Sequence, residues 1–375
     1  MPNIEVTTSP KQSPIVMLTS GVTLGVYLPA LLLRLRFEGL GQKSRIDVLE
    51  NLYDPAQKKR LLENKKAFHA NFRIALMGQR LASNVVSRFC EKTVEVLFAS
   101  WEAQECRYFD VFSGFWMPLL REYAHRTKNG PLHIDRCHMD AKVSVSWQKL
   151  IQEIAPSNHD LLRERDVWFF SHDHSKMHEI RVPDVDVVPF DERDHRLVMH
   201  GGGWGIGTYM QRKADLPDMG MSIDIVVENL EEEDTLDNVC NLMIRPNWNP
   251  WNCNEAGEHT FPPMGQVLDG NYQEFEEAGE HHALLLRKQK AKAIVSKPGG
   301  MTMVDSLATA TPLIHLTPFG DYEAENAKLW EDLGFGMSFD DWVESSAPEA
   351  ELRSMHLNLL KQRHQFIDYG GRHQS

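Results

Sequence analysis

The sequence predicts an α/β fold with two Rossmann-like domains facing a cleft. Two observations lead to this prediction. The order strand, glycine turn and helix occurs twice in the chain. The first strand is Arg196–His200 and the second is Ala293–Val295. The length of 375 residues is also too great for one typical core. We therefore expect one domain over 1–190 and a second domain over 191–375.

Composition limits the classes of function. Apolar residues make up 42% and charged residues 25% of the chain, as in soluble globular proteins. A net charge of −13 argues against a nucleic-acid partner, which needs a basic face, although it leaves room for a nucleotide ligand. The five cysteines are scattered and contain no CxxC pair, so we expect reduced thiols and a cytoplasmic protein.

The uncharged stretch from Gln12 to Leu33 nearly has the length of a membrane span. Glycines and Pro29 interrupt its middle, and no basic segment precedes it as in a signal peptide. A buried strand at Ile15–Leu18, a turn at 19–25 and a helix at Leu28–Phe37 explain it better. We therefore expect no transmembrane segment.

The rest of the first domain alternates helices and strands. Patterning predicts a helical region over 54–92, strands at Val94–Phe98, 110–115 and 131–134, and helices at 118–126 and Ser144–Ile154. The prolines and charges of 181–195 indicate a linker to the second domain.

The second domain begins with the strand Arg196–His200 and a turn holding five glycines. Another strand, Ser222–Val227, precedes an acidic stretch that we interpret as a solvated loop, and 246–263 form a long irregular loop.

The second glycine turn carries the clearest chemical signal. The apolar run Ala293–Val295 ends at Lys297-Pro298-Gly299-Gly300, a helix follows over Met301–Thr309, and Leu313–Leu316 form the next strand. A helix that starts at such a turn presents free N–H groups and a positive dipole end to an anion. Glycines there let the backbone approach a ligand where a Cβ would collide.

Carboxylates flank this anion site. Asp305 lies in the helix, where it can hold sugar hydroxyls, and Asp321, Glu323, Glu325 and Asn326 follow the next strand. Phosphate at the helix end with carboxylates on either side is the chemistry of a nucleotide-sugar site. The competing interpretation is an ordinary strand–helix–strand turn without a ligand.

This stretch resembles the donor-binding half of GT-B glycosyltransferases, whose pattern is Lys/Arg-x-Gly-x-x-Thr-x-x-Glu-x-Leu before a proline-led strand. It is most similar to the peptidoglycan N-acetylglucosaminyltransferase, the plant galactolipid synthases and the UDP-glycosyltransferases, with Asp305 in place of the family's Glu. The resemblance implies a hexosyltransferase that takes a nucleotide-sugar, most simply a UDP-sugar, as co-substrate, with no metal or other cofactor. The donor contacts it implies are Gly203, Trp204, Gly205, Lys297, Gly299, Gly300, Thr302, Asp305, Asp321, Glu325 and Asn326. It also puts the irregular loop 246–263 near the nucleoside base.

The acceptor side departs from the family. The family's first loop reads Gly-x-x-Gly-His-x-x-Pro, and here Val26 takes the histidine position. Glycosyl transfer needs a base for the acceptor hydroxyl. His138, Asp140 and Asp110, at predicted strand ends, are the candidates, although each can be a solvated residue instead. The acceptor itself is unidentified, with a small-molecule or natural-product intermediate as the expectation, and the sequence does not indicate the oligomeric state.

Other classes of protein stay open. The missing histidine fits a non-catalytic homologue, and a UDP-sugar epimerase shares the fold. An NAD(P)-dependent oxidoreductase is a weaker alternative, because the glycines at 203, 205 and 207 do not form a clean G-x-G-x-x-G, although Glu228 ends the next strand. His172 and His174 could hold zinc from one face of a strand, but a polar strand end explains them better and we expect no metal.

Overall fold

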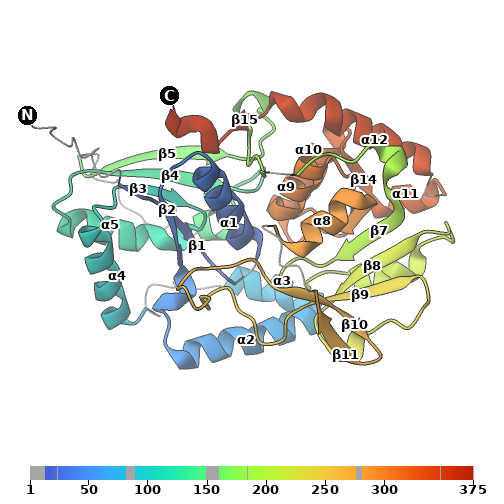
Figure 1. Ribbon diagram of the computed structural model, residues 1–375, viewed down its shortest axis with the longest axis horizontal. Helices are drawn as coiled ribbons and strands as arrows, with labels where there is room; N and C mark the ends of the chain where they lie inside the picture. The colour runs from blue at the N-terminus through green and yellow to red at the C-terminus, as the bar shows by residue number, and fades with distance from the viewer. Residues whose placement is uncertain are drawn as a thin grey trace, which may run out of the picture.

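The computed structural model describes residues 13–22, 24–81, 89–148, 160–183, 185–275, 281–346 and 348–374. The first half of the chain forms a five-stranded parallel sheet in the order β2-β1-β3-β4-β5 (Figure 1). Its strands are β1 (Ile15–Thr19), β2 (Ser44–Val48), β3 (Tyr108–Val111), β4 (Leu132–His138) and β5 (Leu162–Trp168).

The helices of this half are α1 (Leu24–Gly39), α2 (Pro55–Ala70), α3 (Phe72–Leu81), α4 (Glu91–Ala103) and α5 (Met117–Arg126). Helix α1 packs on one face of the sheet and α4 and α5 pack on the other, whereas α2 and α3 pack against Trp204 and Ile206 of the second half. Side chains alternate along β1, as on any strand. Met17 joins the core that contains α1, whereas Val16 and Leu18 join the core formed with α4 and α5.

One predicted strand is wrong, because Val94–Phe98 lie inside α4. The buried residues of α4 are Val94, Phe98 and Trp101, which recur with the spacing of one helix face, whereas Val96 is 65% exposed. The apparent alternation of apolar residues was therefore a helical period. The predicted helix over Ser144–Ile154 is helical at 145–148, and 149–159 lie outside the described residues.

The second half forms an eight-stranded sheet in the order β11-β10-β9-β8-β7-β12-β13-β14. The six neighbouring strands β9, β8, β7, β12, β13 and β14 are parallel to one another. Strands β10 and β11 form an antiparallel edge beside β9. The strands of this sheet are β7 (Asp194–His200), β8 (Ser222–Val227), β9 (Val239–Ile244), β10 (Met264–Leu268), β11 (Asn271–Glu274), β12 (Ala291–Ser296), β13 (Leu313–His315) and β14 (Gly336–Ser338). The helices are α7 (Tyr209–Arg212), α8 (Ala283–Lys290), α9 (Gly300–Thr309), α10 (Asp321–Asp332), α11 (Phe339–Glu344) and α12 (Glu349–Gln362).

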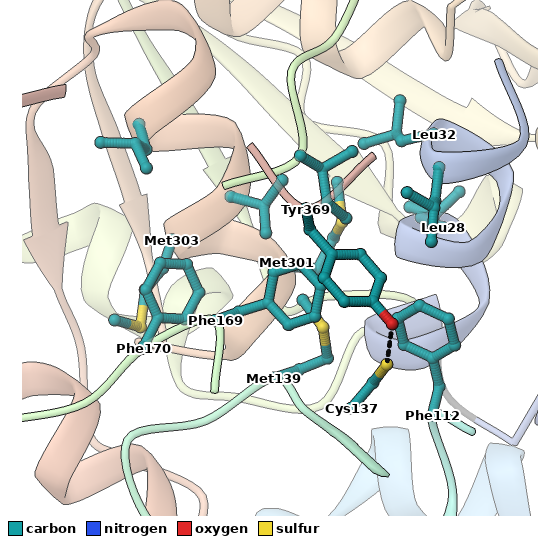
Figure 2. Close-up of a cluster of buried hydrophobic side chains, with 14 of the residues drawn as sticks. Leu28, Leu32, Phe112, Cys137, Met139, Phe169, Phe170, Met301, Met303 and Tyr369 are labelled. Atoms are coloured by element: carbon teal, nitrogen blue, oxygen red, sulfur yellow. Dashed lines mark hydrogen bonds between the residues drawn. The ribbon is translucent and has the colours of Figure 1, made fainter. Parts of the chain in front are cut away.

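The end of the chain returns to the first domain, although the predicted boundary assigns it to the second. Strand β15 (Ile367–Asp368) pairs with β6 (His178–Glu179). The Tyr369 hydroxyl donates to Asp110 at 3.0 Å and to Asp135 at 2.9 Å. Figure 2 shows Tyr369 within the buried cluster beside Cys137 and Phe112.

One hydrophobic core joins the two domains. It contains Leu28 and Leu32 of α1 together with Met301 and Met303 of α9 (Figure 2). The loop 245–263 has no helix or strand and reaches α1, where the Tyr27 hydroxyl donates to the carbonyl of Thr260 at 2.8 Å. Within the described ranges, no helix combines the length and apolar character needed to cross a bilayer.

Candidate functional site

A cavity of about 560 Å³ lies between the domains and is lined by both. The second domain contributes the glycine turn after β7, the start of α9, and the buried polar side chains of His200, His282, Lys288 and Asp305. The first domain contributes the loop after β1, parts of α2 and α3, and Asp140 beyond β4. The cavity thus lies between the two halves that the sequence assigns to donor and acceptor.

The N-terminus of α9 opens into this cavity. Strand β12 is buried along its whole length, and the helix begins at Gly300 with Gly299 as N-cap. Gly299 has a φ of −76°, so neither glycine is needed for a left-handed backbone. Gly300 is needed because a Cβ there would lie 2.2 Å from the carbonyl oxygen of Met139 in the other domain. The N–H groups of the first helical turn have no partner within the helix and suit an anion.

Asp140 lies at this helix end. Its Oδ1 accepts a hydrogen bond from Asn326 Nδ2 at 2.8 Å and lies so close to Gly300 that a Cβ there would meet it at 3.2 Å. Asn326 Oδ1 in turn accepts from the amide of Ala141 at 2.7 Å. Burial, together with the nearby charge of Glu323, raises the pKa of Asp140 to about 6. The structure therefore brings together three predicted site residues, Asp140, Gly300 and Asn326, across the domain interface.

Lys297 forms an ion pair with a residue that was not among the predicted donor contacts. Its Nζ lies 2.5 Å from Oε1 of Glu323, which is 2% exposed and lines the cavity. The other oxygen, Oε2, accepts from the amide of Phe319 at 2.6 Å. Its neighbours Asp321 and Glu325 do not line the cavity: the Asp321 side chain is 89% exposed, and Glu325 pairs with His172 at 3.2 Å. Positions two apart on a helix point in different directions, which is why only one of the three acidic residues faces inward.

Asp305 lies at the floor of the cavity and is 1% exposed. Its Oδ2 accepts from Lys288 Nζ at 2.5 Å, and its Oδ1 lies 3.4 Å from Nε2 of His282. Burial favours the neutral acid, but the charges of Lys288 and His282 outweigh it and hold the pKa of Asp305 at about 2. His200, at the end of β7, lines the same floor. Sequence patterns did not indicate Lys288, His282 or His200, because they lie outside the motif that contains Asp305.

The glycine turn after β7 divides into two parts. Gly203 and Trp204 line the cavity, as does Thr302 of α9. Gly205 is not among the lining residues; its φ is 59°, and its carbonyl accepts from His69 Nδ1 of α2 at 2.9 Å.

The acidic residue that a dinucleotide enzyme would use is already occupied. Glu228, which follows β8, pairs with Lys65 of α2 at 2.8 Å. In this domain arrangement the Glu228 carboxylate forms an ion pair with a lysine of the first domain, so it is not free to bind the ribose hydroxyls of a dinucleotide.

The structure places the other two base candidates outside the cavity. His138 Nε2 donates to Asp166 at 2.7 Å, and its ring stacks on Trp168. Asp110 is 2% exposed and accepts from Arg372 at 2.5 Å. Burial raises the pKa of Asp110 to about 6 although the charge of Arg372 opposes the shift. Of the three candidates, Asp140 alone lines the cavity.

A buried carboxylate also shapes the first loop. Glu50 accepts from the Ser20 hydroxyl and from the Gly21 amide, each at 2.7 Å.

Val26, at the position where the resemblance expects a histidine, lines the cavity. Among the described lining residues of the first domain, Asp140 is the only charged side chain. No group of three or more His, Cys, Asp or Glu side chains suited to a metal ion occurs in the part of the chain that the structure describes.

Comparison with known proteins identifies the fold. No family model matches the sequence, and no curated protein matches it. Among solved structures, the chain is similar to the glycosyltransferase SnogD from Streptomyces nogalater (11% identity, 96% of this chain and 98% of that chain, TM-score 0.54). It is also similar to SsfS6 from Streptomyces sp. SF2575, complexed with thymidine diphosphate (12%, 94% and 95%, 0.55), and to MurG from Acinetobacter baumannii (13%, 96% and 97%, 0.51). The expected fold is confirmed: two Rossmann-like domains in the GT-B arrangement.

Proposed function

We propose that this protein is a hexosyltransferase that moves a sugar from a UDP-sugar to a hydroxyl of an uncharged, largely apolar acceptor. The observation that carries the proposal is the N-terminus of α9, which opens with Gly300 into a cavity lined by both domains. The GT-B fold supports it, since solved proteins of similar structure include glycosyltransferases.

The donor diphosphate binds at the start of α9 in this proposal. The amides of Met301 and Thr302 lie in the first turn, and the Thr302 side chain lines the cavity. Lys297 supplies a positive charge beside them, balanced by Glu323. Fixed donors and a helix dipole stabilise the charge that develops on a leaving diphosphate, so the reaction needs no metal ion in this proposal.

Asp140 is the proposed catalytic base. It lines the cavity, and burial raises its pKa to about 6, which suits proton transfer near neutral pH. Its carboxylate takes the proton of the acceptor hydroxyl while the oxygen bonds to the anomeric carbon. The bond from that carbon to the diphosphate breaks, and UDP leaves with the electron pair.

The acceptor subsite is apolar in this proposal. The first-domain lining includes Val22, Val26, Leu61, Phe68, Phe112 and Phe115. The described lining residues of this domain include no lysine or arginine, so nothing there would neutralise a phosphate or carboxylate on the acceptor. An uncharged molecule with an exposed hydroxyl fits this surface.

A second candidate is a homologue that binds the nucleotide without catalysis. Val26, where the family has a histidine, favours it. The two candidates share donor binding and differ only in turnover.

A nucleotide titration tests the binding that both candidates require. UDP, GDP, ADP and NAD⁺ are added in turn while the melting temperature is followed, since a ligand of the native state raises it by mass action. We expect stabilisation by UDP and none by NAD⁺. Stabilisation by NAD⁺ alone would support the oxidoreductase, and no stabilisation by any of them would reject a nucleotide site.

A further inference from the structure

A second cavity, of about 270 Å³, also lies between the two domains. None of its lining residues within the described ranges lines the first cavity. Its apolar lining includes Phe169, Phe170 and Val182 of the first domain and Val304, Leu307 and Ala308 of α9. Pockets for drug-sized ligands usually measure about 300–1,000 Å³, so this cavity has room for a small molecule.

The charged side chains of this second cavity do not cancel one another. They are Glu179, Arg181 and Arg363. Nε of Arg181 lies 2.7 Å from Oε1 of Glu179, so these two charges neutralise each other. His178, which also lines the cavity, is neutral because burial lowers its pKa. The lining therefore keeps one net positive charge, that of Arg363, in a chain whose net charge is −13.

The guanidinium of Arg363 forms no hydrogen bond or ion pair with any residue that the structure describes. The side chain is partly buried, and burial lowers its pKa, the direction expected for a cation that loses water. A buried arginine normally gains a partner in exchange. Arg193 does so here by donating to the carbonyls of Val188 and Ala291 at 3.0 and 2.9 Å. Arg363 has given up water without such a gain, and its N–H donors are available to a ligand.

The chemistry of the lining defines the ligand that fits it. A guanidinium matches the two oxygens of a carboxylate through two parallel hydrogen bonds. One carboxylate balances the single net charge of the lining. Side chains such as Phe170, Val304 and Leu307 suit a hydrocarbon body, which loses contact with water when it enters. Inorganic phosphate has no apolar surface for these side chains to cover.

We infer that the second cavity binds a small monocarboxylate, whose carboxylate pairs with Arg363 and whose hydrocarbon part packs against α9. The lining comes from both domains, so the bound molecule stabilises the arrangement in which the domains meet. This inference does not rest on the proposed function, because the first cavity shares none of these lining residues among those described.

Calorimetric titrations of the full chain with hexanoate, 1-hexanol and inorganic phosphate test the site. Hexanol has a hydrocarbon chain without the charge, and phosphate has the charge without a chain. We expect hexanoate to bind at least about 10-fold more tightly than either probe and to raise the melting temperature.

Three variants locate the bound hexanoate. Arg363→Gln removes the charge and should weaken hexanoate binding about 10- to 100-fold, as expected for a charge-assisted hydrogen bond. Arg353→Gln is the matched control, because it removes an arginine of α12 that pairs with Asp191, and it should bind hexanoate as the wild type does. Ala308→Leu keeps Arg363 but fills part of the cavity, so it should also weaken hexanoate binding.

Four outcomes overturn the inference. Equal binding of hexanoate and hexanol would reject the role of the charge, and phosphate binding as tight as that of hexanoate would reject the apolar body. Unchanged hexanoate affinity in both Arg363→Gln and Ala308→Leu would place the carboxylate elsewhere, for instance at the start of α9. No detectable binding of hexanoate would reject the carboxylate site. The titration with UDP is separate from all four, so the proposed function stands or fails independently.

Discussion

Replacement of Gly300 by alanine should separate the two domains. A Cβ at this position would lie 2.2 Å from the carbonyl oxygen of Met139, a backbone atom that cannot swing aside. The contact must open by about 1 Å to reach ordinary van der Waals distance. Two hydrogen bonds cross this contact: Asn326 to Asp140, and Ala141 to Asn326. At about 1 kcal/mol each, and more for the one to a carboxylate, their loss should cost about 2–4 kcal/mol.

Gly299→Ala is the matched control. A Cβ there would meet the Glu323 side chain at 3.2 Å, and the φ of −76° suits any residue. We expect a loss below about 1 kcal/mol for this variant. Thermal melting followed by tryptophan fluorescence compares the two variants, and small-angle X-ray scattering reports any increase in the radius of gyration. If Gly300→Ala melts like Gly299→Ala and is equally compact, the domains do not meet in solution as they do here.

The remaining predictions concern ionisable groups and the acceptor loop. Asp140→Asn should lower kcat by roughly 10²–10⁴-fold with UDP affinity retained, and wild-type kcat should fall below pH 6 as this carboxylate is protonated; loss of both transfer and UDP binding would make it structural. The pKa of Asp110 is raised to about 6, above its unfolded value of about 3.9, so its contribution to stability is fully present below pH 4 and is lost as the pH rises through 6. Asp110→Asn should flatten the pH dependence of denaturant unfolding in that window by at most about 3 kcal/mol, and an unchanged profile would contradict the assignment. Val26→His should not raise turnover in steady-state assays, and a large gain would instead identify the native protein as a weakened catalyst.

The fold could be predicted from the sequence where the apolar pattern, the turn residues and the helix pattern agree. The run Ala293–Val295, the glycines at 299 and 300 and the helix after them occur where the pattern predicts them. The prediction of a strand at Val94–Phe98 is wrong because two valines two positions apart fit a strand as well as a helix. Trp101, which completes the buried face of the helix, lies beyond that segment. The return of the C-terminal residues to the first domain depends on tertiary contacts and has no local signal.

The candidate site was only partly predictable for the same reason. The sequence shows the acidic residues after β13 but not which of them point into the cavity. Their directions depend on the residue at which α10 begins, and the sequence pattern does not determine that residue. It could place Asp140 at a strand end but not show that Asn326 of the other domain donates to it. Lys288 carried no motif at all, since only packing brings α8 against α9.

The most direct test of the proposed sugar transfer is an assay of the reaction itself. UDP release is measured from a panel of UDP-hexoses, with 4-methylumbelliferone as an uncharged apolar acceptor and 4-methylumbelliferyl phosphate as a charged control that lacks the free hydroxyl. Mass spectrometry of the acceptor identifies the product. We expect UDP release with at least one UDP-hexose, a hexosylated umbelliferone, no product from the phosphate, and loss of the reaction in Asp140→Asn. Binding of UDP with no release above the level of Asp140→Asn for any donor would contradict transfer and leave a nucleotide-binding protein.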